Sequence, residues 1–185
     1  MSYGANLPFP RGQTMWDGDN SLISASDYAW LEGRTYEQND TEHGSGQKVV
    51  LRIVRNKGSR LPYPMGGVQY GVTANWLGRK VRGEANGETK VAQAPDDVLT
   101  TGVTTNDMFY VVDEGPVRCL AGSLATGVTA MSAGQGVGFG LNGGLLLPST
   151  GSERMYGTLN ESVTTGTTGN RKVLVIAGGL YGHKA

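Results

Sequence analysis

Few residues of this 185-residue chain have the types and the spacing that catalysis or metal binding requires. The two histidines, His43 and His183, each adjoin a glycine, and neither has a cysteine or an acidic cluster at the spacing of metal ligands. We therefore expect no zinc site and no histidine-based acid–base catalysis. The single cysteine, Cys119, lies in the predicted strand 117–120, which is typical of a small buried side chain rather than of a nucleophile.

The carboxylates that adjoin one another are Asp96–Asp97 and Asp113–Glu114. Neighbours in a strand point to opposite faces, and carboxylates in turns are usually solvated, so neither pair suggests two acids that act on one bond. We expect no enzymatic activity, no cofactor and no metal. A small β enzyme with a carboxylate pair assembled from distant positions is kept as a third alternative.

The composition predicts strands joined by glycine-rich turns: 30 residues are glycine and 17% are charged. The formal net charge is +0, and the basic segments 52–60 and 79–82 are interrupted by apolar residues or glycine. These segments are typical of solvated strands and turns, so no nucleic-acid partner is expected. No apolar run approaches the ~18 residues of a membrane span, so no membrane partner is expected either. One cysteine excludes an intrachain disulfide and fits assembly in a reducing compartment.

The elements that would position a site are strands. Residues 108–112 are the densest run of β-branched and aromatic residues, apolar on both faces, so we expect both faces to be covered. Asp113 to Pro116 breaks this run and residues 117–120 alternate, a pattern that predicts a central hairpin. Asn86–Gly87 predicts a tight turn between two short strands. All the predicted strands are 48–54, 68–73, 80–83, 90–94, 108–112, 117–120, 128–131, 135–139, 145–147, 155–160 and 172–177.

Strand after strand without a long helix predicts an all-β fold: a single β-sandwich or barrel-like domain with an extended, mostly irregular N-terminal arm. We divide the chain into an arm (1–45), a β core (46–177) and a C-terminal tail (178–185). The arm is irregular yet rich in aromatics, unlike a disordered segment, so we expect it to lie on its own core or on a neighbouring subunit. Its candidate partner-binding residues are Phe9, Trp16, Tyr28, Trp30 and Tyr36.

Glycines alternate with larger residues from Gly134 to Gly140, which places them on one face of a strand where another backbone could approach closely. This pattern suggests a contact between subunits, and the alternative is a tightly packed strand within one chain. The candidate oligomer contacts are Gly134, Gly136, Gly138 and Phe139.

The order of motifs from Gly46 to Ala177 resembles the cement, or head decoration, proteins of tailed bacteriophages. Its most specific piece runs from Asn106–Asp107 through an aromatic and aliphatic strand to Gly115–Pro116. The supporting pieces are a first strand that ends in Arg55–Asn56, a proline-containing loop at 61–66, a short basic strand at 78–83, a glycine-led turn at 133–137 and a closing strand at 173–176.

This resemblance implies a structural virion protein, made in the host cytoplasm and bound to the outer capsid surface. Such proteins commonly form trimers near local three-fold axes and tie neighbouring subunits of the major capsid protein together. The runner-up is a carbohydrate-binding β module of a phage tail or fibre that uses exposed aromatic side chains as stacking platforms. Its candidate residues are Trp16, Trp30 and Trp76.

Overall fold

The computed structural model describes residues 7–15, 28–58, 66–70, 78–82, 92–99, 102–121, 130–139, 146–148, 156–164 and 171–178. These residues form strands and one short 3-10 turn, η1 (Ala29–Leu31), so the all-β prediction is confirmed. The strands are β1 (Thr35–Asn39), β2 (Lys48–Asn56), β3 (Val68–Tyr70), β4 (Lys80–Arg82), β5 (Ala92–Pro95), β6 (Met108–Ala121), β7 (Ala130–Met131), β8 (Gly136–Phe139), β9 (Leu146–Pro148), β10 (Gly157–Leu159), β11 (Val163–Thr164) and β12 (Arg171–Gly178). No helix in this part of the chain is long and apolar enough to cross a membrane.

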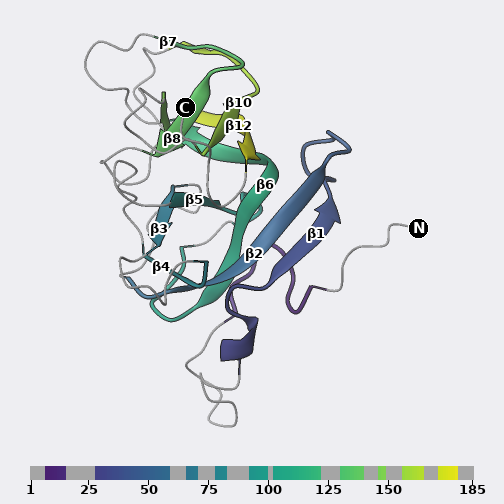
Figure 1. The fold of residues 1–185 in the computed structure, drawn as a ribbon, viewed down its shortest axis with the longest axis vertical. Coiled ribbons are helices and arrows are strands. Elements are labelled where there is room, and N and C mark those ends of the chain that lie inside the picture. Colours follow the sequence, from purple (N-terminus) through teal and green to yellow (C-terminus); the bar gives the residue numbers. More distant parts are fainter. Residues whose placement is uncertain are drawn as a thin grey trace.

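A closed five-stranded barrel forms the centre of the fold (Figure 1). Hydrogen bonds lead from β2 to β4, β3, β5 and β6, and β6 pairs again with β2. The β2–β4 pair is parallel and the others are antiparallel. A barrel of this size is filled by its own side chains. The side chains of the inner cluster are Val54, Val68, Tyr70, Val81, Leu99, Val103, Phe109 and Val111.

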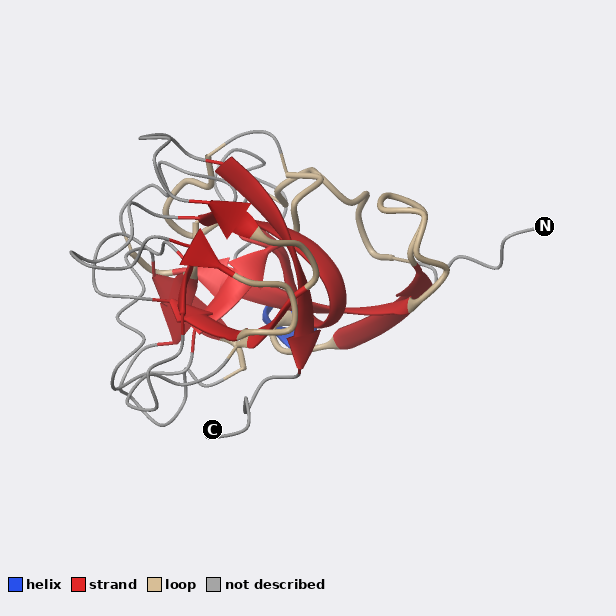
Figure 2. Ribbon diagram, turned by 90° about the horizontal axis from the view of Figure 1, so that it is seen from above, coloured by secondary structure: helices blue, strands red, loops and turns tan. Residues whose placement is uncertain are grey.

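A second circuit of strands shares β6 with the barrel. β6 pairs with β12, followed in order by β10, β8 and β9, and β9 pairs in parallel with the end of β6. β1 adds to the outer edge of β2, while β7 and β11 form a separate two-stranded sheet. Seen from above, the strands curve around the core rather than lying flat (Figure 2). β6 therefore connects the two halves of the fold.

The first half of β6 is buried on both faces, as its sequence predicts. Phe109 and Val111 point into the barrel cluster, whereas Met108, Tyr110 and Val112 join the second and larger cluster. All five residues are at most 1% exposed. Their alternation places β6 between two cores, and this explains why the run is apolar at every position.

The predicted hairpin at Asp113–Pro116 is wrong, because β6 runs on without a turn for 14 residues. The break in the apolar pattern is instead a β-bulge: Val50 pairs with Glu114 and Leu51 with Val112, which leaves Asp113 extra. Gly115 has φ +97, a value that favours glycine, and its backbone passes close to Lys48 O. Beyond the bulge β6 pairs with β12 along its length.

The other predicted strands fall on or overlap observed ones. The hairpin between residues 80–83 and 90–94 is a second error, because β3 lies between β4 and β5 and pairs with both. The turn Asn86–Gly87 itself lies outside the described residues.

The N-terminal residues that the structure describes are attached closely to the barrel. Phe9 and Leu31 belong to the larger cluster, and β1 completes the sheet beside β2. Met15 exchanges two backbone hydrogen bonds with Met108 at 2.8 and 2.9 Å. The division at residue 45 stays a prediction, although these contacts tie both sides of it together. In the predicted tail, residues 179–185 lie outside the described ranges.

Candidate functional site

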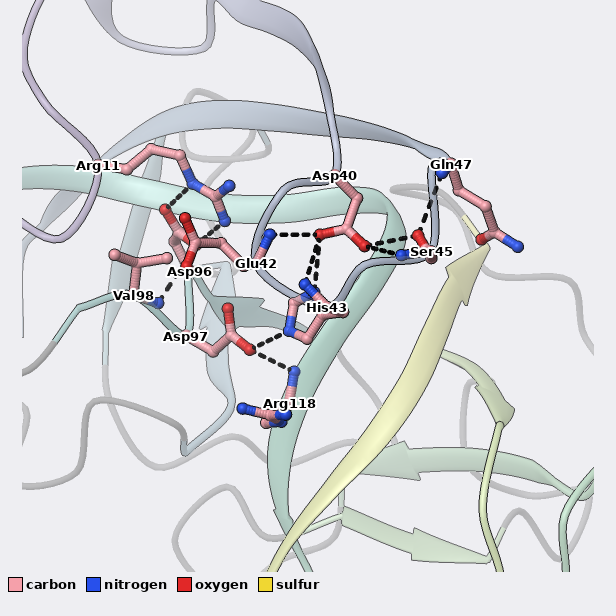
Figure 3. Close-up of polar contacts among 10 residues, drawn as sticks. All are labelled: Arg11, Asp40, Glu42, His43, Ser45, Gln47, Asp96, Asp97, Val98 and Arg118. Atoms are coloured by element: carbon pink, nitrogen blue, oxygen red, sulfur yellow. Dashed lines mark hydrogen bonds and ion pairs between the residues drawn. The ribbon is translucent and has the colours of Figure 1, made fainter.

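A cluster of buried charged side chains lies where three segments of the chain meet beside β6 (Figure 3). Arg11 comes from the N-terminal segment, Asp40 and His43 come from the loop between β1 and β2, and Asp96 and Asp97 follow β5. We call these five residues the His43 cluster. Of all the described residues, they come nearest to a constellation that could do chemistry.

The imidazole of His43 lies between two carboxylates. Its Nδ1 is 3.0 Å from Asp40 Oδ1 and its Nε2 is 2.7 Å from Asp97 Oδ2. The three side chains are 2%, 0% and 6% exposed, respectively. Each ring nitrogen of His43 therefore has a carboxylate oxygen within hydrogen-bond distance.

Asp40 accepts hydrogen bonds from most of its own loop. The backbone N–H groups of Glu42, His43 and Ser45 donate to it, each at 3.0 Å, and the Ser45 hydroxyl donates at 2.5 Å. Burial alone would raise the pKa of Asp40, but these hydrogen bonds from Ser45 and His43 outweigh it and lower the pKa well below its usual range. Asp40 is therefore a carboxylate that organises the loop.

The other half of the cluster binds the N-terminal segment. Arg11 donates two hydrogen bonds to Asp96, from Nε at 2.8 Å and from Nη2 at 2.5 Å. Burial opposes the charged guanidinium, yet Asp96 outweighs that effect and the pKa of Arg11 is raised. Asp97 Oδ2 also accepts from the backbone N–H of Arg118 at 2.9 Å. Asp97 Oδ1 is buried without a hydrogen-bond partner.

This arrangement joins three segments of the chain through side chains that hydrogen-bond to one another. Both nitrogens of His43 are occupied, and the Ser45 hydroxyl donates to Asp40 rather than to an imidazole that could activate it. Among the described residues no group of three or more His, Cys, Asp or Glu side chains could hold a metal ion. We conclude that the His43 cluster fastens three segments together.

Two further buried ion pairs connect the barrel to its surroundings. Arg52 donates to Asp113 Oδ2 at 2.8 and 2.5 Å, and Arg55 pairs with Glu32. Burial raises the pKa of Asp113, with Arg52 acting against it. The expectation that Asp113 and Asp96 are solvated is wrong, since they are 3% and 1% exposed.

Two motifs that are separated by about fifty residues meet at the base of the barrel. The Asn56 side chain, 0% exposed, donates to Val103 O at 3.2 Å and to Thr104 O at 3.1 Å. The backbones of Asn56 and the Asn106–Asp107 pair exchange hydrogen bonds at 2.9 and 2.7 Å. Asn106 has φ +75, which asparagine tolerates better than most residues. These motif residues therefore fix the end of β2 to the start of β6.

The predicted partner-binding aromatics occupy different environments. Phe9 is buried and stacks on Tyr110 with ring centroids 4.4 Å apart, and Tyr28 and Tyr36 pack partly buried against the same core. Trp30 is 57% exposed. Trp16 and Trp76 lie outside the described residues. Of the described members of the predicted set, Trp30 is the large side chain that is mostly exposed.

The candidate oligomer contacts lie on and beside β8. Gly134 is exposed in the preceding turn, and Gly136 and Gly138 pair with β10 and β9 of the same chain. Phe139 is buried against Tyr156, with ring centroids 5.0 Å apart. A role of these residues in oligomer formation stays a prediction. Cys119 is buried as expected, and burial raises the pKa of its thiol.

Sequence reasoning missed the His43 cluster because its contacts span long distances along the chain. Asp97 lies 54 residues from His43 and Asp96 lies 85 residues from Arg11. The one local signal was the spacing of Asp40, His43 and Ser45, which is typical of an aspartate that accepts hydrogen bonds from the following turn.

The fold and its buried charges define a small all-β barrel protein whose described polar residues bind one another. No protein-family model matches the chain, and no curated protein sequence matches it. Among solved structures, the chain is similar to the crystal structure of the head fiber gp8.5 N base in bacteriophage phi29. The TM-score is 0.44 at 16% identity, and the match covers 73% of this chain and 99% of that chain. A likeness at this score and identity carries no argument about function.

Proposed function

We propose that this chain is a structural protein of a bacteriophage virion that binds the outer capsid surface and bridges subunits of the major capsid protein. The observation that carries the proposal is the meeting of Arg55–Asn56 with Asn106–Asp107. Both pieces belong to the motif set that resembles the head decoration proteins, and in the fold they lock β2 to β6. The motifs that carry the resemblance are therefore in contact in the fold, although they are far apart in the sequence.

The rest of the motif set lies on the same strands. Gly115–Pro116 follows the bulge at Asp113, in the part of β6 that pairs with β12, and residues 173–176 lie in β12. The motif residues contact one another within the fold, so binding to a partner falls to the exposed residues. A cement protein likewise binds the capsid through its exposed surface.

Such a protein would stabilise a capsid by mass action. A ligand that binds the assembled shell but not its separate subunits shifts the equilibrium toward the shell by an amount that grows with occupancy. We also propose a homotrimer, because attachment at three points adds avidity without a new kind of contact.

The test is co-sedimentation of the purified chain with expanded capsid shells that lack it, together with sedimentation equilibrium of the chain alone. We expect saturable binding at a fixed ratio to the major capsid protein, shells that survive more heat, and a trimer in solution. Absence of binding to such shells contradicts the capsid role, and a monomer contradicts the trimer.

The exposed ring of Trp30 also keeps the carbohydrate-binding alternative open, since aromatic faces are common stacking platforms. Arg34 lies over the Trp30 ring at 4.8 Å from its centroid, and Trp30 is 57% exposed. Binding of one sugar class on a glycan array, with quenching of tryptophan fluorescence that Trp30→Ala abolishes, would favour this alternative over the capsid role.

A further inference from the structure

The fold brings together two basic segments that the sequence separates. β4 lies parallel to the end of β2, with Arg55 opposite Lys80 and Asn56 opposite Val81 (Figure 1). The backbone N–H of Lys57 donates to Val81 O at 2.7 Å. In the sequence these segments read as unconnected solvated strands, but in the structure they form one surface.

A third segment, residues 28–34, extends this surface. A Cβ atom built on Gly33 would lie 3.0 Å from Gly78 O, so the two backbones are in close contact. Next to Gly33, the Arg34 guanidinium lies over the Trp30 ring and its Nε donates to Trp30 O at 3.1 Å. We call the surface formed by residues 28–34, 55–58 and 78–82 the basic face.

The charges of the basic face have one sign. Its one carboxylate, Glu32, is buried in the ion pair with Arg55 and so neutralises a charge that is itself buried. The remaining charged residues of these segments are cations, and among the described residues no ion pair engages them. They are the exposed Arg34, Lys57, Arg79 and Arg82 and the partly buried Lys80.

The chain as a whole has a formal net charge of +0, so the basic face is a local excess. Among the described residues the exposed carboxylates lie elsewhere, on or near the β1–β2 hairpin and the bulge of β6: they are Glu37, Glu42 and Glu114. A neutral protein with a local excess of cations on one face orients that face toward a negative partner before contact.

We propose that the basic face, with Trp30 at its edge, docks on an acidic surface of a protein partner. This inference rests on the proposed function, in which that partner is the capsid shell. Tryptophan and arginine are the side chains that most often dominate the energy of protein interfaces, and here they adjoin each other. An exposed tryptophan beside arginines is typical of protein interfaces, whereas a nucleic-acid backbone is bound mainly through clustered charge, so a protein partner fits the face better.

The experiment compares shell binding by three variants of the full chain over a range of salt concentrations. Arg79→Gln/Arg82→Gln removes two charges from the face, and Trp30→Ala removes the exposed ring. The control Lys48→Gln/Arg118→Gln removes two exposed cations from other strands, with the same change in net charge. Circular dichroism verifies that each variant is folded.

We expect the double variant of the face to bind expanded shells about tenfold more weakly at low salt, with the difference shrinking at high salt as charges are screened. Trp30→Ala should weaken binding about thirtyfold at every salt concentration. The control should bind like the unmodified chain.

Three outcomes overturn the inference. If the unmodified chain binds shells and the face variants bind as well as the control, this inference fails while the proposed function stands. If the unmodified chain binds no shells, the proposed function fails first and the partner named here fails with it. If duplex DNA binds the face as tightly as the shells do, its occupant is a nucleic acid.

Discussion

At the scale of single residues, this protein uses its titratable side chains to hold loops in place. Asp40 shows this most clearly, because a buried carboxylate is stable as an anion only when donors surround it. Its donors all lie within five residues, so the loop folds around the charge. His43 then extends that arrangement to Asp97.

Asp40→Asn should lower the free energy of unfolding at pH 7 by about 1.5–3 kcal/mol. Hydrogen bonds to a charged oxygen are replaced by weaker ones to a neutral amide oxygen. The donors that bonded the other carboxylate oxygen then face an NH₂ group, which cannot accept from them. The folded pKa of Asp40 is depressed, so its contribution is present above the usual value of about 3.9 and is lost as the pH falls below it. Urea unfolding at pH 7 and pH 3 measures this.

The variant and the unmodified chain should therefore differ less at pH 3 than at pH 7. The control is Glu42→Gln, which neutralises an exposed carboxylate of the same loop and should change stability by less than about 0.5 kcal/mol. An equal loss for Asp40→Asn at both pH values would contradict the assigned role of the anion.

The conformation of Gly115 makes a second prediction at this scale. An added methyl group at Gly115 meets Lys48 O at φ +97, whereas at Gly134, with φ +85, it meets no atom within 4 Å. Gly134→Ala should cost about 1–2 kcal/mol from backbone strain alone. Gly115→Ala should cost about 1–3 kcal/mol more from the clash. Equal melting temperatures for the two variants would mean that the bulge is not tightly packed.

At the scale of elements, sequence reasoning found most of the strands, but it missed β1 and β11 and some of the strand connections. The runs at 48–54, 135–139 and 172–177 are strands because β-branched and apolar residues fit a pleated, buried surface. The hairpin at 113–116 failed because glycine and proline mark a bulge as readily as a turn, and the distinction depends on Lys48 and Val50 of a distant strand. Pairings such as β6 with β9 leave no local trace.

The ion pair between Glu32 and Arg55 joins the segment after η1 to β2, with both side chains at most 4% exposed. Glu32→Gln breaks this buried ion pair, so it should lower the free energy of unfolding by about 3–5 kcal/mol. Glu37 and Lys48 form the matched exposed pair, at 59% and 65% exposure, and Glu37→Gln should cost at most about 1 kcal/mol. Chemical denaturation of both variants measures the contrast, and similar losses would contradict it.

At the scale of the whole molecule, the question is whether the N-terminal residues are a separable arm. The sequence predicts that a chain without residues 1–40 keeps a folded core and loses capsid binding. The structure places Phe9 and Leu31 in the larger core and pairs Arg11 and Glu32 with buried partners, Asp96 and Arg55. These contacts argue that the arm is part of the fold.

Deletion of residues 1–40 should therefore abolish cooperative unfolding. Each buried Phe or Leu side chain contributes about 1.5–3 kcal/mol, and each orphaned buried charge costs about 3–5 kcal/mol, whereas a whole domain is stable by about 5–15 kcal/mol. Near-ultraviolet circular dichroism and urea titration measure the loss.

Deletion of residues 1–6 is the control, because it removes none of the described contacts. If the longer truncation unfolds cooperatively with the stability of the control, residues 1–45 are an independent arm. If the longer truncation does not unfold cooperatively, its loss of capsid binding is a result of unfolding. Substitutions of exposed residues, such as Trp30→Ala, are then needed to locate the binding surface.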